Sequence, residues 1–154
     1  MDIKELYQEI VLDHGKNPRN KNKCKDFNKD AKGHNPLCGD KVHVYAKLDK
    51  EKKVEDISFE GEGCAISIAS ASIMTEVIKG KEFNVAKKIL EHFLNMLKEG
   101  SKISINSLSE NENTTMMSLS GVKRFPMRVK CATLAWHTFL HAAEDSKKTV
   151  NTEN

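Results

Sequence analysis

The spacing of hydrophobic and polar positions predicts a β-hairpin in the first half of the chain. From residue 41 to residue 60 apolar and polar side chains alternate, and a charged stretch at residues 49–53 interrupts the alternation. A period of two is typical of strands that bury one face, so this segment predicts two paired strands. A weaker edge strand is predicted around Phe27 and Ala31, within the polar stretch that precedes the hairpin.

Helical spacing follows in the second half and also opens the chain. Apolar residues recur every three or four positions in segments 3–14, 65–79, 86–97 and 126–142. Small residues make the second of these segments apolar on more than one side, which predicts a central, tightly packed helix. Between the last two segments, residues 101–115 are expected to form a loop and residues 116–122 a short helix.

The order of these elements favours an α+β fold, because strands come early and helices late instead of alternating. We expect a single domain over residues 1–145, since no linker or internal repeat divides it. Residues 146–154 are polar and are expected to form a disordered C-terminal tail.

Composition narrows the classes of function. Charged residues make up 31% of the 154 residues, but the net charge is only +3 and the two signs are interleaved, so no nucleic-acid partner is expected. No apolar run reaches roughly 18 residues, and no membrane partner is expected. The first residues lack the pattern of a signal peptide, so we expect a cytoplasmic location.

Three cysteines stand at predicted boundaries between elements. Cys38 lies in a C-G-D turn before a strand, Cys64 begins a helix, and Cys131 lies in the first turns of another helix. In a cytoplasmic chain such cysteines are more often metal-binding or catalytic than disulfide-bonded. With Asp40 they offer three thiolates and one carboxylate, a set that suits a tetrahedral Zn²⁺ and, through its sulfurs, also an iron–sulfur cluster. A carboxylate exchanges more readily than a fourth thiolate, which indicates a site that opens.

Other residues keep competing interpretations at this point. Asp40 also suits a turn that bonds its own backbone. Arg128 lies one helical turn before Cys131 and can steady a thiolate or a persulfide there, or it can be a surface arginine. Cys24 lies among lysines and is interpreted as exposed and incidental.

The histidines give no convincing ligand spacing. His34 and His43 flank the Cys38 turn, but His43 is expected to meet solvent on the outer strand face. His137 and His141 are four residues apart on a predicted helix, and without a metalloprotease-type partner motif a surface position is favoured for both.

The motifs around the three cysteines resemble those of the NifU N-terminal/IscU family. They are N-P-L-C-G-D at residues 35–40, F-E-G-E-G-C-A-I-S at 59–67 and R-V-K-C-A-T-L-A-W at 128–136, and the segments 6–14 and 17–20 also match. The resemblance is greatest to the SufU branch, because Lys130 stands where IscU proper has histidine and the stretch between Cys64 and Cys131 is extended.

The resemblance implies a three-stranded antiparallel sheet packed against several helices. It also implies that Cys38, Asp40, Cys64 and Cys131 bind zinc and that the partner is a PLP-dependent cysteine desulfurase of the SufS type. In SufU-like proteins the desulfurase persulfide passes to the cysteine of the C-G-D turn, here Cys38, while a desulfurase histidine takes its place on zinc. Arg128 matches the arginine of the third motif and is a candidate to support the incoming sulfur.

Three functions remain to be distinguished. The first is a zinc-dependent sulfurtransferase that stimulates the desulfurase and feeds iron–sulfur cluster assembly, with a SufBCD-type scaffold as a candidate downstream partner. The second is a scaffold on which a transient [2Fe–2S] cluster is assembled and transferred. The third is a structural zinc module that acts as an adaptor.

Overall fold

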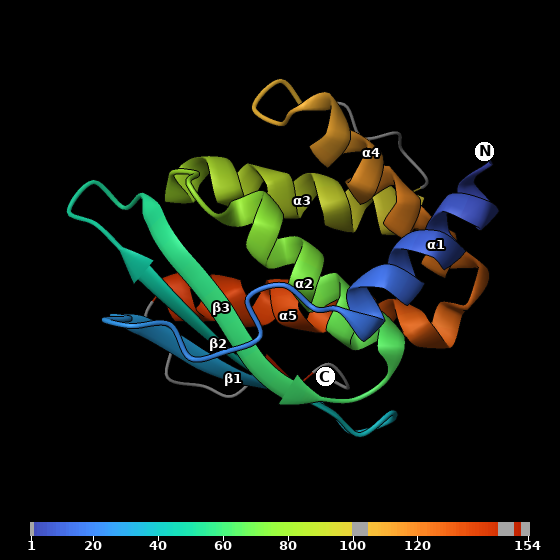
Figure 1. Cartoon of the computed structure of the whole chain (residues 1–154), viewed down its shortest axis with the longest axis horizontal. Helices are drawn as coiled ribbons and strands as arrows, with labels where there is room; N and C mark the ends of the chain where they lie inside the picture. The colour runs from blue at the N-terminus through green and yellow to red at the C-terminus, as the bar shows by residue number, and fades with distance from the viewer. Residues whose placement is uncertain (1, 100–104, 145–149, 152–154) are drawn as a thin grey trace.

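A computed structural model shows three long antiparallel strands, extended at one edge by the two-residue strand β4, with the helices packed on one side of the sheet (Figure 1). The structure describes residues 2–99, 105–144 and 150–151. The order of elements is α1 Ile3–Lys16, β1 Lys29–Asn35, β2 Asp40–Leu48, β3 Val54–Glu62, α2 Ala65–Ile78, α3 Phe83–Glu99, α4 Glu110–Ser118, two short 3₁₀ helices η1 Leu119–Arg124 and η2 Pro126–Arg128, α5 Val129–Ala143, and β4 Val150–Asn151. The predicted α+β class and antiparallel sheet are confirmed.

The sheet has the order β3-β2-β1-β4. β2 pairs with β3 as the predicted hairpin, and β1 covers the other edge of β2 with Asn35 opposite Asp40. The predicted edge strand around Phe27 and Ala31 is β1. It contains Ala31 but begins at Lys29, so Phe27 lies outside it. Residues 150–151 were expected in a disordered tail, but they form β4, which pairs parallel to β1. The rest of that tail, residues 146–149 and 152–154, lies outside the described residues.

The core lies between the inner face of the sheet and helices α2 and α5. The alternating valines of β2 point into it, together with Phe59 of β3. Trp136 of α5 is fully buried and donates its indole N–H to Ser70 Oγ of α2. Its ring packs at a tilt against that of Phe93 of α3, with the ring centroids 4.6 Å apart. Gly33 lets β1 approach α5, because a Cβ there would meet Thr138 and Leu134. The predicted central position of α2 is confirmed, since most of its side chains are buried.

Two helical predictions need correction. Residues 110–115 were expected in a loop but form the start of α4, where Ser109 and Glu112 make a capping box. The end of the predicted short helix continues as the 3₁₀ helix η1. Pro126 begins η2 and α5 starts only at Val129, so the last helix starts later than its sequence pattern indicates. No helix among the described residues is both long and apolar enough to cross a bilayer.

Candidate metal centre

The four predicted ligands come from four segments of the chain that meet at one end of the sheet. The four-residue loop between β1 and β2 holds Cys38, and Asp40 is the first residue of β2. Cys64 precedes α2 as its N-cap, and Cys131 is the third residue of α5. The β1–β2 loop, the start of α2 and the 3₁₀ segments leading into α5 all lie at the lower right of Figure 1.

Three of the predicted ligands form a compact cluster. One ligand atom each of Cys38, Asp40 and Cys131 lies within 4.8 Å of the other two, and the two sulfurs are 3.4 Å apart. Around a tetrahedral Zn²⁺ with Zn–S bonds of 2.3 Å, two sulfurs would be about 3.8 Å apart. The size of the cluster and its mixture of soft sulfur and carboxylate oxygen therefore fit Zn²⁺. The same sulfurs can also ligate iron.

Cys64 is held differently. Its Sγ does not lie within 4.8 Å of all three atoms, and it accepts the backbone N–H of Ser67 at 3.5 Å, which caps α2. Its own backbone N–H donates to Asp40 Oδ1 at 2.9 Å. Cys64 therefore supports Asp40 through its backbone, and its place as the fourth ligand stays a prediction.

The buried part of the cluster carries groups whose negative charge needs a compensating cation. Asp40 is fully buried, and Cys131 is only 1% exposed. Burial raises the pKa of the Cys131 thiol, and hydrogen bonds with Asp40 and Cys38 raise it further. A buried carboxylate beside sulfur ligands is costly unless a positive charge compensates it. A bound metal ion supplies that charge and holds the cysteines as thiolates.

Arg128 reaches the cluster from its exposed edge. Its Nη1 lies 3.5 Å from Cys38 Sγ, and the neighbouring sulfurs raise the pKa of the guanidinium, Cys131 contributing most. The structure thus brings this predicted residue to Cys38. Lys130, its exposed neighbour, lies two residues further along the chain.

Sequence reasoning missed one member of the site. Asn35, noted only as part of a motif, is fully buried at the end of β1. Its amide Nδ2 donates to Asp40 Oδ2 at 3.3 Å and to Cys131 Sγ at 3.5 Å. Its position at the end of a strand, next to the C-G-D turn, was the available signal.

Exposed apolar side chains lie next to Cys38 and Arg128 in the chain. Leu37 is 53% exposed in the loop that holds Cys38, and Phe125 and Met127 are exposed beside Arg128. An adjoining groove of about 530 Å³ runs between α1 and the start of α2, with Leu12 and Phe125 among its lining residues. Exposed apolar side chains gathered in one place are typical of surfaces that bind another protein.

The interpretation of Cys24 as exposed is wrong. Cys24 is 7% exposed, its backbone N–H donates to Ser58 Oγ at 2.9 Å, and burial raises the pKa of its thiol. The sequence around it is rich in lysine, but the side chain turns inward against β3.

The histidines lie outside the cluster. The expectation that His43 meets solvent is only partly met, because it pairs with Asp30 at 2.6 Å and is half-buried. His137 and His141 are also half-buried, and burial lowers the pKa of His137. A surface position for that pair is therefore wrong in part.

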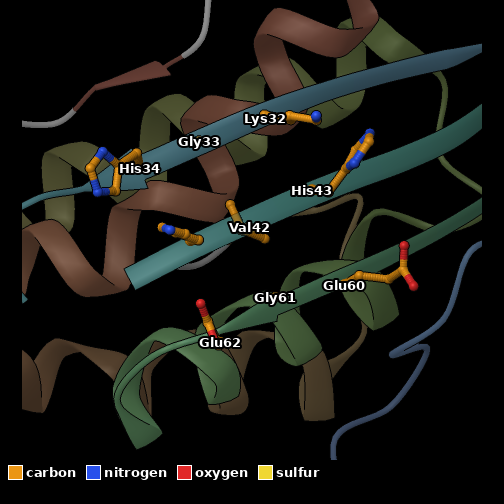
Figure 2. Close-up of a pocket in the computed structure, with 9 residues that line it drawn as sticks. Lys32, Gly33, His34, Val42, His43, Glu60, Gly61 and Glu62 are labelled. Carbon is orange, nitrogen blue, oxygen red and sulfur yellow. The ribbon is translucent and has the colours of Figure 1, made fainter. Parts of the chain in front are cut away.

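A second hollow, of about 590 Å³, lies on the outer face of the sheet (Figure 2). Lys32, His43 and Glu60 border it on one side, and His34 and Glu62 on the other. Its charges are of both signs, and none of the three clustered ligands lines it.

Comparison with known proteins identifies the family of this chain. A family model described as the NifU-like N terminal domain matches residues 6–132. The zinc-dependent sulfurtransferase SufU of Bacillus subtilis is 42% identical over 135 residues, which cover 88% of this chain and 87% of the relative. The iron–sulfur cluster assembly scaffold protein IscU of Streptococcus pyogenes is 37% identical over 144 residues, covering 94% and 86%.

Solved structures show the same fold. The crystal structure of a SUF-system protein from Fervidobacterium islandicum, assigned as a cluster assembly scaffold, superposes with a TM-score of 0.78 at 34% identity and covers 90% of this chain and 97% of its own. The N-terminal NifU-like protein of Brucella abortus superposes with a TM-score of 0.80 at 22% identity, covering 94% and 96%, a likeness of fold alone. The chain belongs to the NifU-like N-terminal domain family.

Proposed function

We propose that this protein is a zinc-dependent sulfur acceptor that takes sulfur from a SufS-type cysteine desulfurase and passes it toward iron–sulfur cluster assembly. The observation that carries the proposal is the unequal exposure of the clustered ligands. Cys38 is partly exposed on a loop, beside the Arg128 guanidinium, whereas Asp40 and Cys131 are buried. A relative that shares 42% of its residues bears the name of this activity.

The transfer is a thiol–disulfide type of exchange. The Cys38 thiolate attacks the outer sulfur of the desulfurase persulfide, and the S–S bond to the desulfurase cysteine breaks. The desulfurase cysteine leaves as a thiolate, so Cys38 carries the persulfide and no external oxidant or reductant is needed. Zinc, when bound, keeps the ligand thiolates deprotonated. Arg128 offers a positive charge to the sulfur that accumulates negative charge.

A surface for the desulfurase is available next to this cysteine. Three exposed apolar side chains stand next to the reactive groups in the chain: Leu37 precedes Cys38, and Phe125 and Met127 precede Arg128. We infer that the desulfurase covers them when it delivers sulfur. A SufBCD-type scaffold is the candidate recipient after that step.

A second function is favoured by the relatives named as scaffolds, including one whose alignment covers 94% of this chain. In that function the same cysteines hold a [2Fe–2S] cluster during assembly. Metal and acid-labile sulfide, measured on protein purified anaerobically without a metal-binding tag, separate the two. About one zinc per chain without labile sulfide supports the acceptor, and iron with labile sulfide supports the scaffold.

The variant Cys38→Ala tests the acceptor against an adaptor. A sulfur acceptor loses its stimulation of the desulfurase when Cys38 is removed, because no thiolate remains to take the persulfide. An adaptor still stimulates the desulfurase when Cys38 is replaced by alanine. Cys24→Ala is the matched control, since Cys24 lies outside the cluster and is expected to leave stimulation unchanged.

A further inference from the structure

Asn35 presents both hydrogens of its amide to the buried half of the cluster. Its Nδ2 lies 3.3 Å from Asp40 Oδ2 and 3.5 Å from Cys131 Sγ, and the residue is fully buried. Its Oδ1 is buried too and has no hydrogen-bond partner within the described part of the chain. An unpaired buried acceptor is unusual, so this side chain is placed for what its nitrogen does.

The chemistry of the neighbours determines which end of the amide faces them. A carboxylate is only an acceptor, and so is a thiolate. If the amide were turned over, its oxygen would face both of them and all three groups would repel. The nitrogen therefore points to Asp40 and Cys131, and the oxygen is left unpaired on the other side.

The two cysteines of the cluster are consequently unequal. Cys131 accepts an N–H from Asn35 and is 1% exposed, whereas the hydrogen bonds of Asn35 among the described residues do not include Cys38. The Asn35 amide and the surrounding core hold the Cys131 sulfur in place and cover it, and a covered sulfur is reached less readily by a persulfide or an alkylating reagent. Cys38 instead lies partly exposed on a loop, where its sulfur is 3.4 Å from Cys131 Sγ and 3.5 Å from Arg128 Nη1.

We propose that Asn35 determines which cysteine takes up sulfur: it restrains Cys131 and Asp40 as the fixed pair of ligands and leaves Cys38 as the reactive one. This rests on the proposed function and deepens it. Asn35 is a positioning residue, because it acts through Cys131 and Asp40 and does not itself receive sulfur.

The test compares Asn35→Ala and Asn35→Ser with the unmodified chain, and Asn28→Ala serves as control. The Asn28 side chain also forms hydrogen bonds within the fold, to the backbone N–H and C=O of Leu48, but it lies outside the cluster. Each protein is incubated with a cysteine desulfurase and cysteine, and the persulfide on each cysteine is quantified by peptide mass spectrometry. We expect nearly all persulfide on Cys38 in the unmodified chain and at least a several-fold larger share on Cys131 in both Asn35 variants.

A second measurement does not depend on sulfur transfer. The metal-free proteins are alkylated with a limiting amount of iodoacetamide, and Cys131 labelling is divided by labelling of Cys24, the buried cysteine elsewhere in the chain. The proposal predicts that this ratio rises several-fold in both variants and not in Asn28→Ala. If Asn35 only supports the fold, both cysteines become more reactive together and the ratio stays constant, which overturns the proposal.

The two measurements separate failure of the proposal from failure of the proposed function. No persulfide on Cys38 of the unmodified chain contradicts sulfur acceptance, while the alkylation ratio still tests Asn35. Persulfide confined to Cys38 in both variants, with an unchanged ratio, contradicts the role of Asn35 alone.

Discussion

The guanidinium of Arg128 is a positively charged group in contact with the proposed sulfur acceptor. It is exposed, and its Nη1 lies 3.5 Å from Sγ of the partly exposed Cys38, whereas Asp40 and Cys131 are buried. A cation at this distance stabilises the negative charge of a persulfide.

Removing this charge is expected to slow sulfur acceptance without releasing the metal. We expect Arg128→Ala to lower desulfurase stimulation several-fold, because a charge-assisted contact to the sulfur of Cys38 is lost. Zinc content should stay near that of the unmodified chain. Sulfide release in a coupled assay and metal analysis measure the two effects. Lys130→Ala, two residues away and exposed, is the control, and an equal loss in that variant would contradict a specific role for Arg128.

At the scale of elements, the connection from β3 to α2 is held against Asp40 by a glycine. Gly63 has a φ of +149°, and a Cβ on it would collide with the Asp40 carboxylate. Gly39 also has a positive φ, of +72°, but a Cβ there would meet nothing within 4 Å. Both glycines therefore have a positive φ that other residues rarely adopt, but only at Gly63 is there no room for a Cβ.

This pair gives a matched prediction. Gly39→Ala is expected to cost about 1–2 kcal/mol of stability, the cost of the backbone conformation alone. Gly63→Ala adds a clash and is expected to cost about 3 kcal/mol or more and to weaken zinc binding, because Asp40 must move. Urea unfolding measures the first effect, and competition with a zinc indicator measures the second. Equal zinc affinity in the two variants would mean that Asp40 does not bind the metal.

Helices α1 and α2 are joined through a buried histidine. His14 Nδ1 lies 2.8 Å from Ser72 Oγ, and Ser72 Oγ also accepts the backbone N–H of Arg19. Burial lowers the pKa of His14 and Arg19 lowers it further, while Glu76 and Asp13 oppose the shift. The neutral imidazole is therefore the form that the folded protein prefers.

Stability is accordingly expected to fall as the pH drops below about 6.5, the ordinary pKa of histidine. A pKa lowered in the folded state means that the unfolded chain binds the proton first, so protonation favours unfolding. His137, whose pKa is lowered by burial, acts in the same direction. His14→Asn should reduce the loss of stability between pH 7 and pH 5, measured by urea unfolding of metal-free protein. His92→Asn, at an exposed position on α3, is the control, and an equal reduction there would contradict the assignment.

At the scale of the whole molecule, the cluster ties the sheet to the last helix. Cys38 and Cys131 are 93 residues apart in sequence and come from the β1–β2 loop and from α5. A metal ion bound by both closes a long loop of chain, so metal binding and folding are coupled.

Zinc removal is therefore expected to lower the melting temperature. At a free zinc concentration of 100 times the dissociation constant, binding adds about 2.7 kcal/mol, which corresponds to about 5–10 °C for a chain of this length. Thermal unfolding with and without a chelator measures the shift. Cys131→Ser should melt at the same temperature in both conditions, and a shift that persists in that variant would place the zinc elsewhere.

The sequence by itself determined the parts of this protein that depend on neighbouring residues. Alternation over residues 41–60 specified the hairpin, because a strand with one buried face must repeat every two residues. The small residues of α2 specified a central helix, and the three cysteine motifs specified the family. The start of α4 could also have been predicted, since Ser109 and Glu112 have the spacing of a capping box. The polar residues around them favoured a loop instead.

Only the tertiary structure decided what depends on residues far apart. The burial of Cys24 follows from its contact with Ser58, 34 residues away, and the local lysines gave the opposite impression. The Cys64 sulfur caps its own helix, so three of the four predicted ligand atoms cluster and the fourth does not. The role of Asn35 required α5 to bring Cys131 against the end of β1, 96 residues away. Local pattern fixes elements through short-range sterics and periodicity, whereas site geometry depends on how those elements pack.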